Sequence, residues 1–219
     1  MEMKENRYKL WQDLYLTAKN NMRISKNNNG VLIEVAAQHP LTDGEKPNEE
    51  FEKRLVEAIQ LFKEKTEEGK RVFIYVPGSI HMANGHADKI SLSEAGKRFL
   101  IDKGISPDCI FADEMNRKYK GDMGVYNSTD ECYVASQIFR EMKLAELHSV
   151  CSSAQMMRKV LSYIRFGYVP YMHAVSCDEM YHNYIDEVFK FIPKLLEDDN
   201  VLQGESEDAI RIRKARKPE

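Results

Sequence analysis

The chain has 219 residues, of which 42% are hydrophobic and 31% are charged, and its formal net charge is −3 at pH 7. These values are typical of a globular protein with one core, and they predict no general attraction to nucleic acid or to an anionic membrane. No apolar run reaches the roughly 20 residues that span a bilayer, and MEMKENRYK lacks the apolar segment of a signal peptide, so we expect a cytoplasmic protein.

The first half of the chain is expected to alternate helix and strand. Helical spacing of apolar side chains predicts an N-terminal helix over residues 6–22. A β-branched run predicts a strand over 31–37, followed by a loop over 42–48 and a helix from 51 to near Gly69. A buried strand over 72–76 then leads through a polar loop to a helix over 93–103.

The second half continues the alternation. We expect a strand over 109–112, a polar loop over 113–126, a helix over 128–142 and a strand over 147–151. A helix over 154–166, a strand over 168–174 and a helix over 178–196, interrupted near Pro193, complete the pattern. Five strand–helix alternations predict an α/β fold: a doubly wound, mainly parallel five-stranded sheet with helices on both faces, Rossmann-like.

The domain organisation is expected to be simple. Residues 1–204 form a single domain, including the extra N-terminal helix, and residues 205–219 form a charged tail that is basic near its end. The tail is interpreted as solvated, with a surface helix or a contact with an acidic partner as alternatives. Four cysteines show no metal-type spacing and are expected to be free thiols: Cys109, Cys132, Cys151 and Cys177.

Polar side chains follow each predicted strand directly. Because the carboxyl ends of parallel strands share one edge of a sheet, these residues are expected to converge on one cleft. The candidate ligand-binding residues are His39, Arg54, Gly78, Ser79, Ser93, Asn127, Ser152, Ser153 and Arg158. The candidate residues for proton transfer are His81, Glu94 and Glu131.

The chemistry of these residues leaves alternatives. The small turn at Gly78 and Ser79 would let backbone N–H groups approach a phosphate or carboxylate, or it simply ends a strand. Arg158 suits bidentate binding of an anion, or a surface salt bridge. The head group of Arg54 either reaches the cleft or extends to solvent.

Helix starts carry a further ambiguity. Ser93 and Ser128 fit helix caps, whereas Glu94 and Glu131 would face the cleft from their helix starts and orient a hydroxyl or act as bases. No dinucleotide fingerprint, P-loop or GxSxG motif is present in the sequence. The spacing of His81, His86 and Asp88 is too loose to predict a metal site.

Several motifs, taken in order, resemble the YdcF/SanA/ElyC-like family of bacterial Rossmann-like proteins over about residues 31–175. They are Arg54 on the helix after the first strand, Val76-Pro77-Gly78-Ser79 in place of the usual Ser-Gly-Gly turn, Ser93-Glu94-Ala95 with Gly104, the Asn127–Glu131 segment, and Val150–Arg158 in place of Val-Thr-Ser-x-x-His-Met-x-Arg. The family histidine corresponds to Gln155, so proton transfer by that group is lost. Several relatives carry an N-terminal membrane anchor, and S-adenosylmethionine binding has been proposed for one branch.

The leading hypothesis is a cytoplasmic hydrolase or transferase that binds a small anionic metabolite, nucleotide- or phosphate-bearing, at the carboxyl edge of the sheet. One alternative is an S-adenosylmethionine-binding protein, for which Glu94, Asp113 or Glu114 would hold the ribose. The other is a non-catalytic binding or regulatory module whose basic tail engages a partner.

Overall fold

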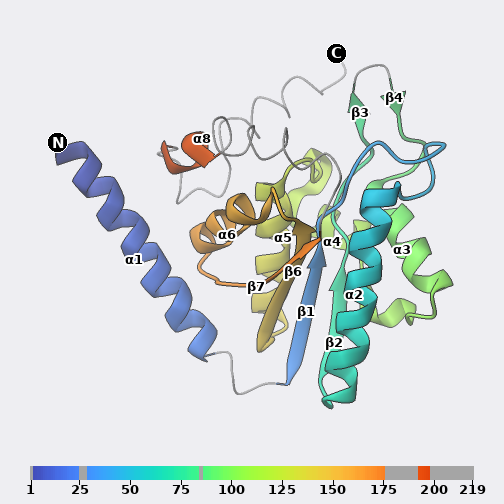
Figure 1. Cartoon of the computed structure of the whole chain (residues 1–219), viewed down its shortest axis with the longest axis horizontal. Helices are drawn as coiled ribbons and strands as arrows, with labels where there is room; N and C mark the ends of the chain where they lie inside the picture. The colour runs from blue at the N-terminus through green and yellow to red at the C-terminus, as the bar shows by residue number, and fades with distance from the viewer. Residues whose placement is uncertain (1, 25–28, 84–85, 176–191, 198–219) are drawn as a thin grey trace.

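The computed structural model describes the chain except residues 1, 25–28, 84–85, 176–191 and 198–219 (Figure 1). Its main sheet contains β1 (Gly30–Val35), β2 (Arg71–Tyr75), β5 (Ile110–Phe111), β6 (Glu146–Ser152) and β7 (Tyr171–Val175). The strand order is β5-β2-β1-β6-β7, and every neighbouring pair is parallel. The predicted doubly wound Rossmann-like α/β fold is therefore confirmed.

The strand order fixes where the sheet can present a crevice. From β1 the chain moves outward through β2 to β5, and it then returns to the other side of β1 for β6 and β7. Val31 pairs with Val72 of β2 on one side and with Glu146 of β6 on the other. The connections that leave β1 and β6 run in opposite directions, so they separate beyond the carboxyl ends of these two strands, where an open sheet can form a crevice.

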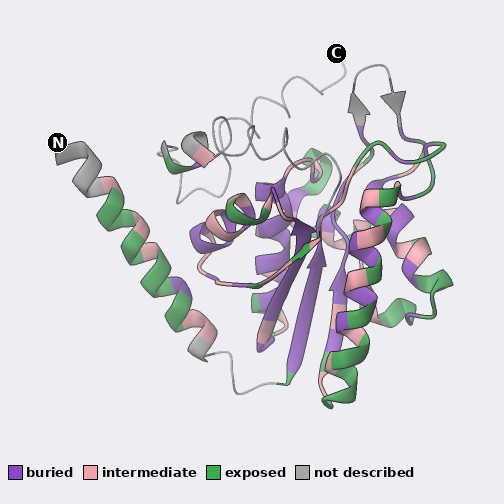
Figure 2. Cartoon of the chain, viewed as in Figure 1, coloured by how far each residue is buried: buried purple, intermediate pink, exposed green. Residues whose placement is uncertain are grey.

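Helices cover both faces of this sheet (Figure 1). On one face lie α2 (Glu49–Glu67) and α3 (Leu92–Asp102), and on the other lie α5 (Ser128–Glu141) and α6 (Met156–Arg165). Successive side chains of a strand point to opposite faces, so each strand contributes to two apolar layers. These strands and the inner sides of the helices are buried (Figure 2).

The two apolar layers show this division residue by residue. The layer under α2 and α3 is built from β1, β2 and helix side chains, among them Val31, Ile33, Val35, Val72, Ile74, Phe51, Leu55, Ala58 and Leu100. The layer under α5 and α6 takes the alternate strand residues and includes Leu32, Tyr75, Leu147, Val134, Ile138, Phe139 and Tyr163. The central strands β1, β2 and β6 therefore contribute buried side chains to both layers, and each covering helix contributes buried side chains to the layer beneath it.

The predicted N-terminal helix is confirmed as α1 (Glu2–Ile24), which lies beside α6 (Figure 1). Ala18 is fully buried, and Asn21 Nδ2 donates to Gly167 O at 2.9 Å, just after α6. The other side chains of α1 over residues 7–22, where burial is described, are exposed or half-buried (Figure 2). Among the helices of the described ranges, none joins the length and the apolar character that crossing a bilayer requires.

The expectation of a polar loop over residues 113–126 is wrong. The segment contains α4 (Asp113–Lys120) and the 3₁₀ turn η3 (Gly121–Met123). Met115 and Tyr119 are spaced four residues apart and pack against the layer under α5. The acidic first turn and the basic last turn of α4 also complement the helix dipole.

Smaller differences concern strands and the chain end. The polar loop after β2 contains a hairpin of β3 (Met82–Ala83) and β4 (His86–Ala87). Cys109, predicted in a strand, lies instead in the 3₁₀ turn η2 (Pro107–Cys109), whose Pro107 favours a turn. In the predicted final helix, α8 (Ile192–Glu197) is described, whereas Cys177, most of residues 178–196 and the tail over 205–219 lie outside the described residues.

Candidate functional site

The turn after β2 is held tightly against its neighbours. Gly78 has a φ of +105°, and a Cβ there would lie 2.8 Å from Leu92 Cβ and 3.1 Å from Ala37 Cβ. The chain after β1, the turn after β2 and the start of α3 therefore meet at this glycine. Ser93 N donates to Gly78 O at 2.9 Å, and Ser93 Oγ donates to Val76 O at 2.5 Å. Ser93 thus fastens α3 to the end of β2.

Ser79 is bonded to the segment that precedes α5. Its N–H donates to Val125 O at 2.9 Å, and its Oγ accepts from Val125 N, also at 2.9 Å. The same segment continues to Asn127, the N-cap of α5, whose Oδ1 accepts from Asp130 N. The Ser79 N–H is thus engaged within the protein, which favours side chains over this amide as ligand donors.

The N-caps of α3 and α5 are not Ser93 and Ser128, the two serines that the sequence suggested for this role. Ser91 caps α3 by accepting from Glu94 N at 2.9 Å, and Ser93 lies inside the helix. Asn127 caps α5, and Ser128 is its first residue. Glu94 is partly exposed and pairs with Arg98 one turn along, at 2.7 Å. Its carboxylate is therefore at the surface of the carboxyl edge.

Glu131 lies in a buried ion-pair cluster beneath that edge. Lys159 Nζ is 2.6 Å from Glu131 Oε2 and 2.5 Å from Glu34 Oε1. Ser149 Oγ and Tyr163 OH both donate to Glu34 Oε2, at 2.6 and 3.2 Å. The carboxylate of Glu131 is thus committed to fixing α5 to α6 and β1.

The two predicted histidines meet at the ends of β1 and β2. The rings of His39 and His81 are stacked, with centroids 3.4 Å apart and an angle of 13° between planes. His81 is buried and His39 exposed. Asp88 links the same two segments, because its Oδ1 accepts from Leu41 N at 2.9 Å and its N donates to His81 O. The side chain of His86 lies outside the described residues.

The two predicted arginines occupy different positions. Arg54 is fully buried and donates to Ala36 O at 3.0 Å, to Ala37 O at 3.4 Å and to Gln38 Oε1 at 3.3 Å, and it also pairs with Glu50. Arg54 therefore holds the chain that leaves β1 rather than extending to solvent. Arg158 lies half-buried in the first turn of α6.

The two predicted serines close the edge between β6 and β7. Ser152 is the last residue of β6, and its Oγ accepts from Gln155 N at 3.4 Å. Ser153 N and Oγ both donate to Val175 O, at 3.2 and 3.5 Å. This contact ties the end of β7 to the carboxyl edge.

A polar groove of about 580 Å³ opens at the carboxyl ends of β2 and β5, between the starts of α3 and α4. It contains two of the predicted residues, Ser79 and Glu94. Asp113 also lines it and was a candidate from sequence for holding a ribose. The remaining lining residues were not predicted from sequence to bind a ligand: Ile80, Lys89, Ile90, Ser91, Asn116, Arg117, Gly121, Asp122, Gly124 and Tyr126. We call this hollow the α3/α4 groove.

A chain of hydrogen bonds orients one carboxylate in the α3/α4 groove. Tyr75 OH donates to Asn116 Oδ1 at 2.6 Å, which turns the amide nitrogen of this buried residue towards Asp113. Asn116 Nδ2 is 3.4 Å from Asp113 Oδ1, and Ser91 Oγ donates to Asp113 Oδ2 at 2.6 Å. Burial, first of all, raises the pKa of Tyr75 well above its usual value, so its hydroxyl stays a donor. Asp113 is thus fixed from both α3 and β2.

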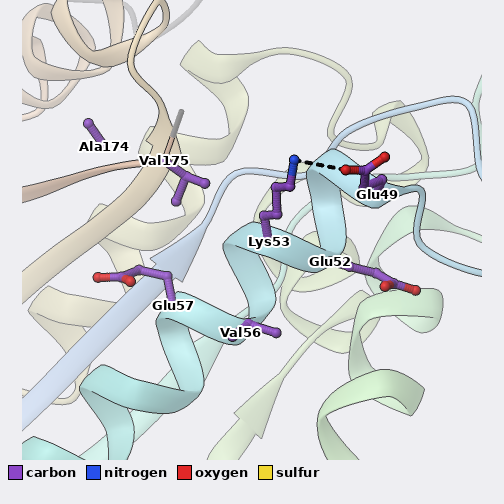
Figure 3. A pocket seen from close by; sticks show the side chains of 7 residues that line it. All are labelled: Glu49, Glu52, Lys53, Val56, Glu57, Ala174 and Val175. Carbon is purple, nitrogen blue, oxygen red and sulfur yellow. Dashed lines mark ion pairs between the residues drawn. The ribbon is translucent and has the colours of Figure 1, made fainter. Parts of the chain in front are cut away.

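A second, smaller hollow of about 470 Å³ lies between α2 and the end of β7. It is lined by Glu49, Glu52, Lys53, Val56, Glu57, Ala174 and Val175 (Figure 3). Lys53 pairs with Glu49 at 2.9 Å (Figure 3). Both partners are substantially exposed, so this hollow is a solvated surface and contains none of the predicted site residues.

Comparison of the chain with protein-family models, curated proteins and solved structures found no match in any of the three. The fold and the geometry of the carboxyl edge therefore carry the functional argument. Over the described ranges, no group of three or more His, Cys, Asp or Glu side chains is arranged to hold a metal ion.

Proposed function

We propose that the protein is an enzyme that binds a small, phosphate-bearing metabolite in the α3/α4 groove. The observation that carries the proposal is Asp113, a carboxylate oriented by Ser91 and Asn116 in a groove that also contains the cations Lys89 and Arg117. Lys89 and Arg117 are both exposed, and Lys89 pairs with Glu45 at 3.3 Å. A groove with cations at its surface and one positioned carboxylate can bind an anionic group and a hydroxyl at the same time.

The proposed roles follow from the chemistry of each side chain. Arg117 is exposed on α4 and has the planar donor geometry that suits a phosphate. Asp113 would accept the proton of an attacking hydroxyl, from water in a hydrolase or from a second substrate in a transferase. Glu94 would be the second carboxylate near the bound ligand. The motif resemblance to the YdcF-like family, which includes Ser93-Glu94-Ala95, supports a site at this edge.

Thermal-shift measurements with inorganic phosphate, ribose 5-phosphate and AMP test this proposal. We expect at least one of these phosphorylated probes to raise the unfolding temperature of the protein, and Arg117→Ala to lose the shift. Arg71→Ala is the matched control, because Arg71 is exposed at the start of β2, at the opposite edge of the sheet. Equal shifts for the wild type and for Arg117→Ala would refute the assignment of the groove.

A second candidate function uses the same groove to bind S-adenosylmethionine. It is favoured by two of the three carboxylates that line the groove, Glu94 and Asp113, either of which can accept bonds from ribose hydroxyls; the third is Asp122. Calorimetric titration with S-adenosylmethionine separates the two candidates. Heat that is lost in Asp113→Asn but retained in Arg117→Ala would support the cofactor over the phosphorylated metabolite.

A further inference from the structure

Two histidines on neighbouring strands are hydrogen-bonded to each other under α2, away from the α3/α4 groove. His148 lies in β6 and His173 in the edge strand β7, and His148 Nδ1 is 2.9 Å from His173 Nε2. His148 is buried and His173 half-buried. The ring of Tyr171 stacks on His148 with a centroid distance of 5.0 Å, which limits its rotation.

The outer nitrogens of both rings face carboxylates. His148 Nε2 is 3.2 Å from Glu146 Oε2, and His173 Nδ1 is 3.9 Å from Glu57 Oε1 of α2. Figure 3 shows Glu57 projecting from α2 on the side of Ala174 and Val175. The chain of groups therefore runs from Glu57 through the two imidazoles to Glu146.

The partners assign the protons. Glu146 accepts, so His148 Nε2 carries hydrogen and His148 Nδ1 presents a lone pair. His173 Nε2 must then donate to His148 Nδ1, which leaves His173 Nδ1 as the unprotonated nitrogen opposite Glu57. A first added proton enters at His173 Nδ1, where it gains an anionic partner and disturbs neither existing bond.

A second proton has no site in the pair where it could bind without disturbing an existing hydrogen bond. The remaining basic nitrogen is His148 Nδ1, and protonation there would set two N–H groups against each other across 2.9 Å. It would also place two imidazolium charges in rings whose centroids are 5.1 Å apart. The second proton therefore breaks the bond between the strands.

We propose that His148 and His173 form an acid-sensitive latch that holds the edge strand β7 on β6 and opens when both rings are protonated. The latch goes beyond the proposed function, since it depends on nothing that the groove binds. Its opening would reach the carboxyl edge, because Val175 at the end of β7 accepts the bonds from Ser153.

The surrounding charges set the pH range of the latch. Glu57, Glu64 and Glu146 favour protonation, whereas Lys65 opposes it at both rings. Lys70 pairs with Glu146 at 2.9 Å and so weakens the pull of that carboxylate on His148. Burial is the largest influence and lowers the pKa of both histidines. The latch therefore stays closed at neutral pH.

Amide hydrogen exchange of the full chain, corrected for the intrinsic effect of pH, tests the latch. Between about pH 7.5 and about pH 5 we expect protection of the β7 amides to fall by about tenfold or more, while β1 amides keep theirs. His148→Gln retains a side chain that can donate to Glu146 and accept from His173, but it cannot take up a proton. In this variant we expect the β7 protection to change by less than about threefold over the same range.

The control and the second variant keep the result decisive. His39→Gln removes a histidine outside the latch and should retain the wild-type fall in β7 protection. His173→Gln replaces the other ring, keeps a donor to His148 Nδ1 and serves if His148→Gln does not fold. A fall in β7 protection that persists in the folded glutamine variant would overturn the latch. An equal loss of protection in β1 and β7 of the wild type would also overturn it, because it would indicate global unfolding.

Discussion

Lys159 Nζ lies 2.5 Å from Glu34 Oε1, and neither side chain has any exposure to solvent. The two residues come from α6 and β1, which are separated by 125 positions in the chain. Burial disfavours the ammonium, but the carboxylates of Glu131 and Glu34 outweigh this effect and raise the pKa of Lys159. Glu34 has its pKa raised by burial while Lys159 lowers it. The cluster fixes the first turns of α5 and α6 against β1, one of the two strands where the chain connections leave in opposite directions.

Replacing Lys159 by Met should destabilise the fold by about 3–5 kcal/mol, because two buried carboxylates would lose their cation. The free energy of unfolding in urea measures this loss. Lys53→Met is the control: its pair with Glu49 is 41% and 81% exposed, so we expect a change within about 0.5 kcal/mol. Removing the charge of Glu34 as well, in Glu34→Gln with Lys159→Met, should recover part of the loss. A loss below about 1 kcal/mol for Lys159→Met would show that the ion pair is unimportant for stability.

The sheet could be predicted because burial leaves a simple pattern in the sequence. A strand with one solvated face alternates apolar and polar residues. The runs Val72–Val76 and Val31–Ala37 lack this alternation, and Glu34 is the one charged residue within them. This residue was the available signal for the buried cluster. A carboxylate inside an apolar strand requires a partner, but the pattern cannot name one that lies in a distant helix.

The α3/α4 groove could not be predicted as a unit. Three of its lining residues, Asp113, Asn116 and Arg117, come from α4. In α4 two of eight residues, Met115 and Tyr119, are large and apolar, so helical periodicity is weak. Asp113 was a ribose-binding candidate from sequence, but its contact with Ser91 and the role of Asn116, bonded to Tyr75, depend on the helix α4 that was not predicted. Ser79 and Glu94, which line the groove, could be placed at the carboxyl edge from sequence because they directly follow β2 or open the next helix.

Gly78→Ala should be more destabilising than an alanine at another glycine of positive φ. Strain from the backbone costs about 1–2 kcal/mol, and the close contacts with Leu92 and Ala37 should add about 1–3 kcal/mol. Gly104→Ala isolates the first effect, since its φ is +89° and no atom lies within 4 Å of the added Cβ. Urea unfolding of both variants gives the difference. Equal losses would mean that the contacts around Gly78 relax without cost.

Thiol labelling should distinguish the described cysteines. Cys132 and Cys151 are buried, and burial raises the pKa of Cys151 to about 12 and that of Cys132 well above its usual value. Cys109 is only half-buried. Iodoacetamide at about pH 8 should therefore modify Cys109 and leave the other two unreacted, as read by peptide mass spectrometry, because the thiolate is the reactive form. Labelling in urea is the control, in which all three should react. Modification of Cys151 in the folded protein at the rate of Cys109 would contradict its burial.

The free energy of unfolding should fall as the pH is lowered below about 6.5, the usual histidine pKa. His148 and His173 have lowered pKa values in the fold, chiefly through burial, so the unfolded chain takes up protons that the folded chain does not. Their contribution is complete above the unfolded pKa and is lost as the pH falls towards the folded values. Urea titrations between about pH 7.5 and about pH 5.5 should show the loss in the wild type and in His39→Gln, whereas the double variant His148→Gln, His173→Gln should give a flatter profile. The window stays above the usual range of carboxylates, so protonation of Glu146, whose pKa is lowered in the fold, cannot produce the same slope. A double variant as steep as the wild type would place the proton uptake elsewhere in the chain.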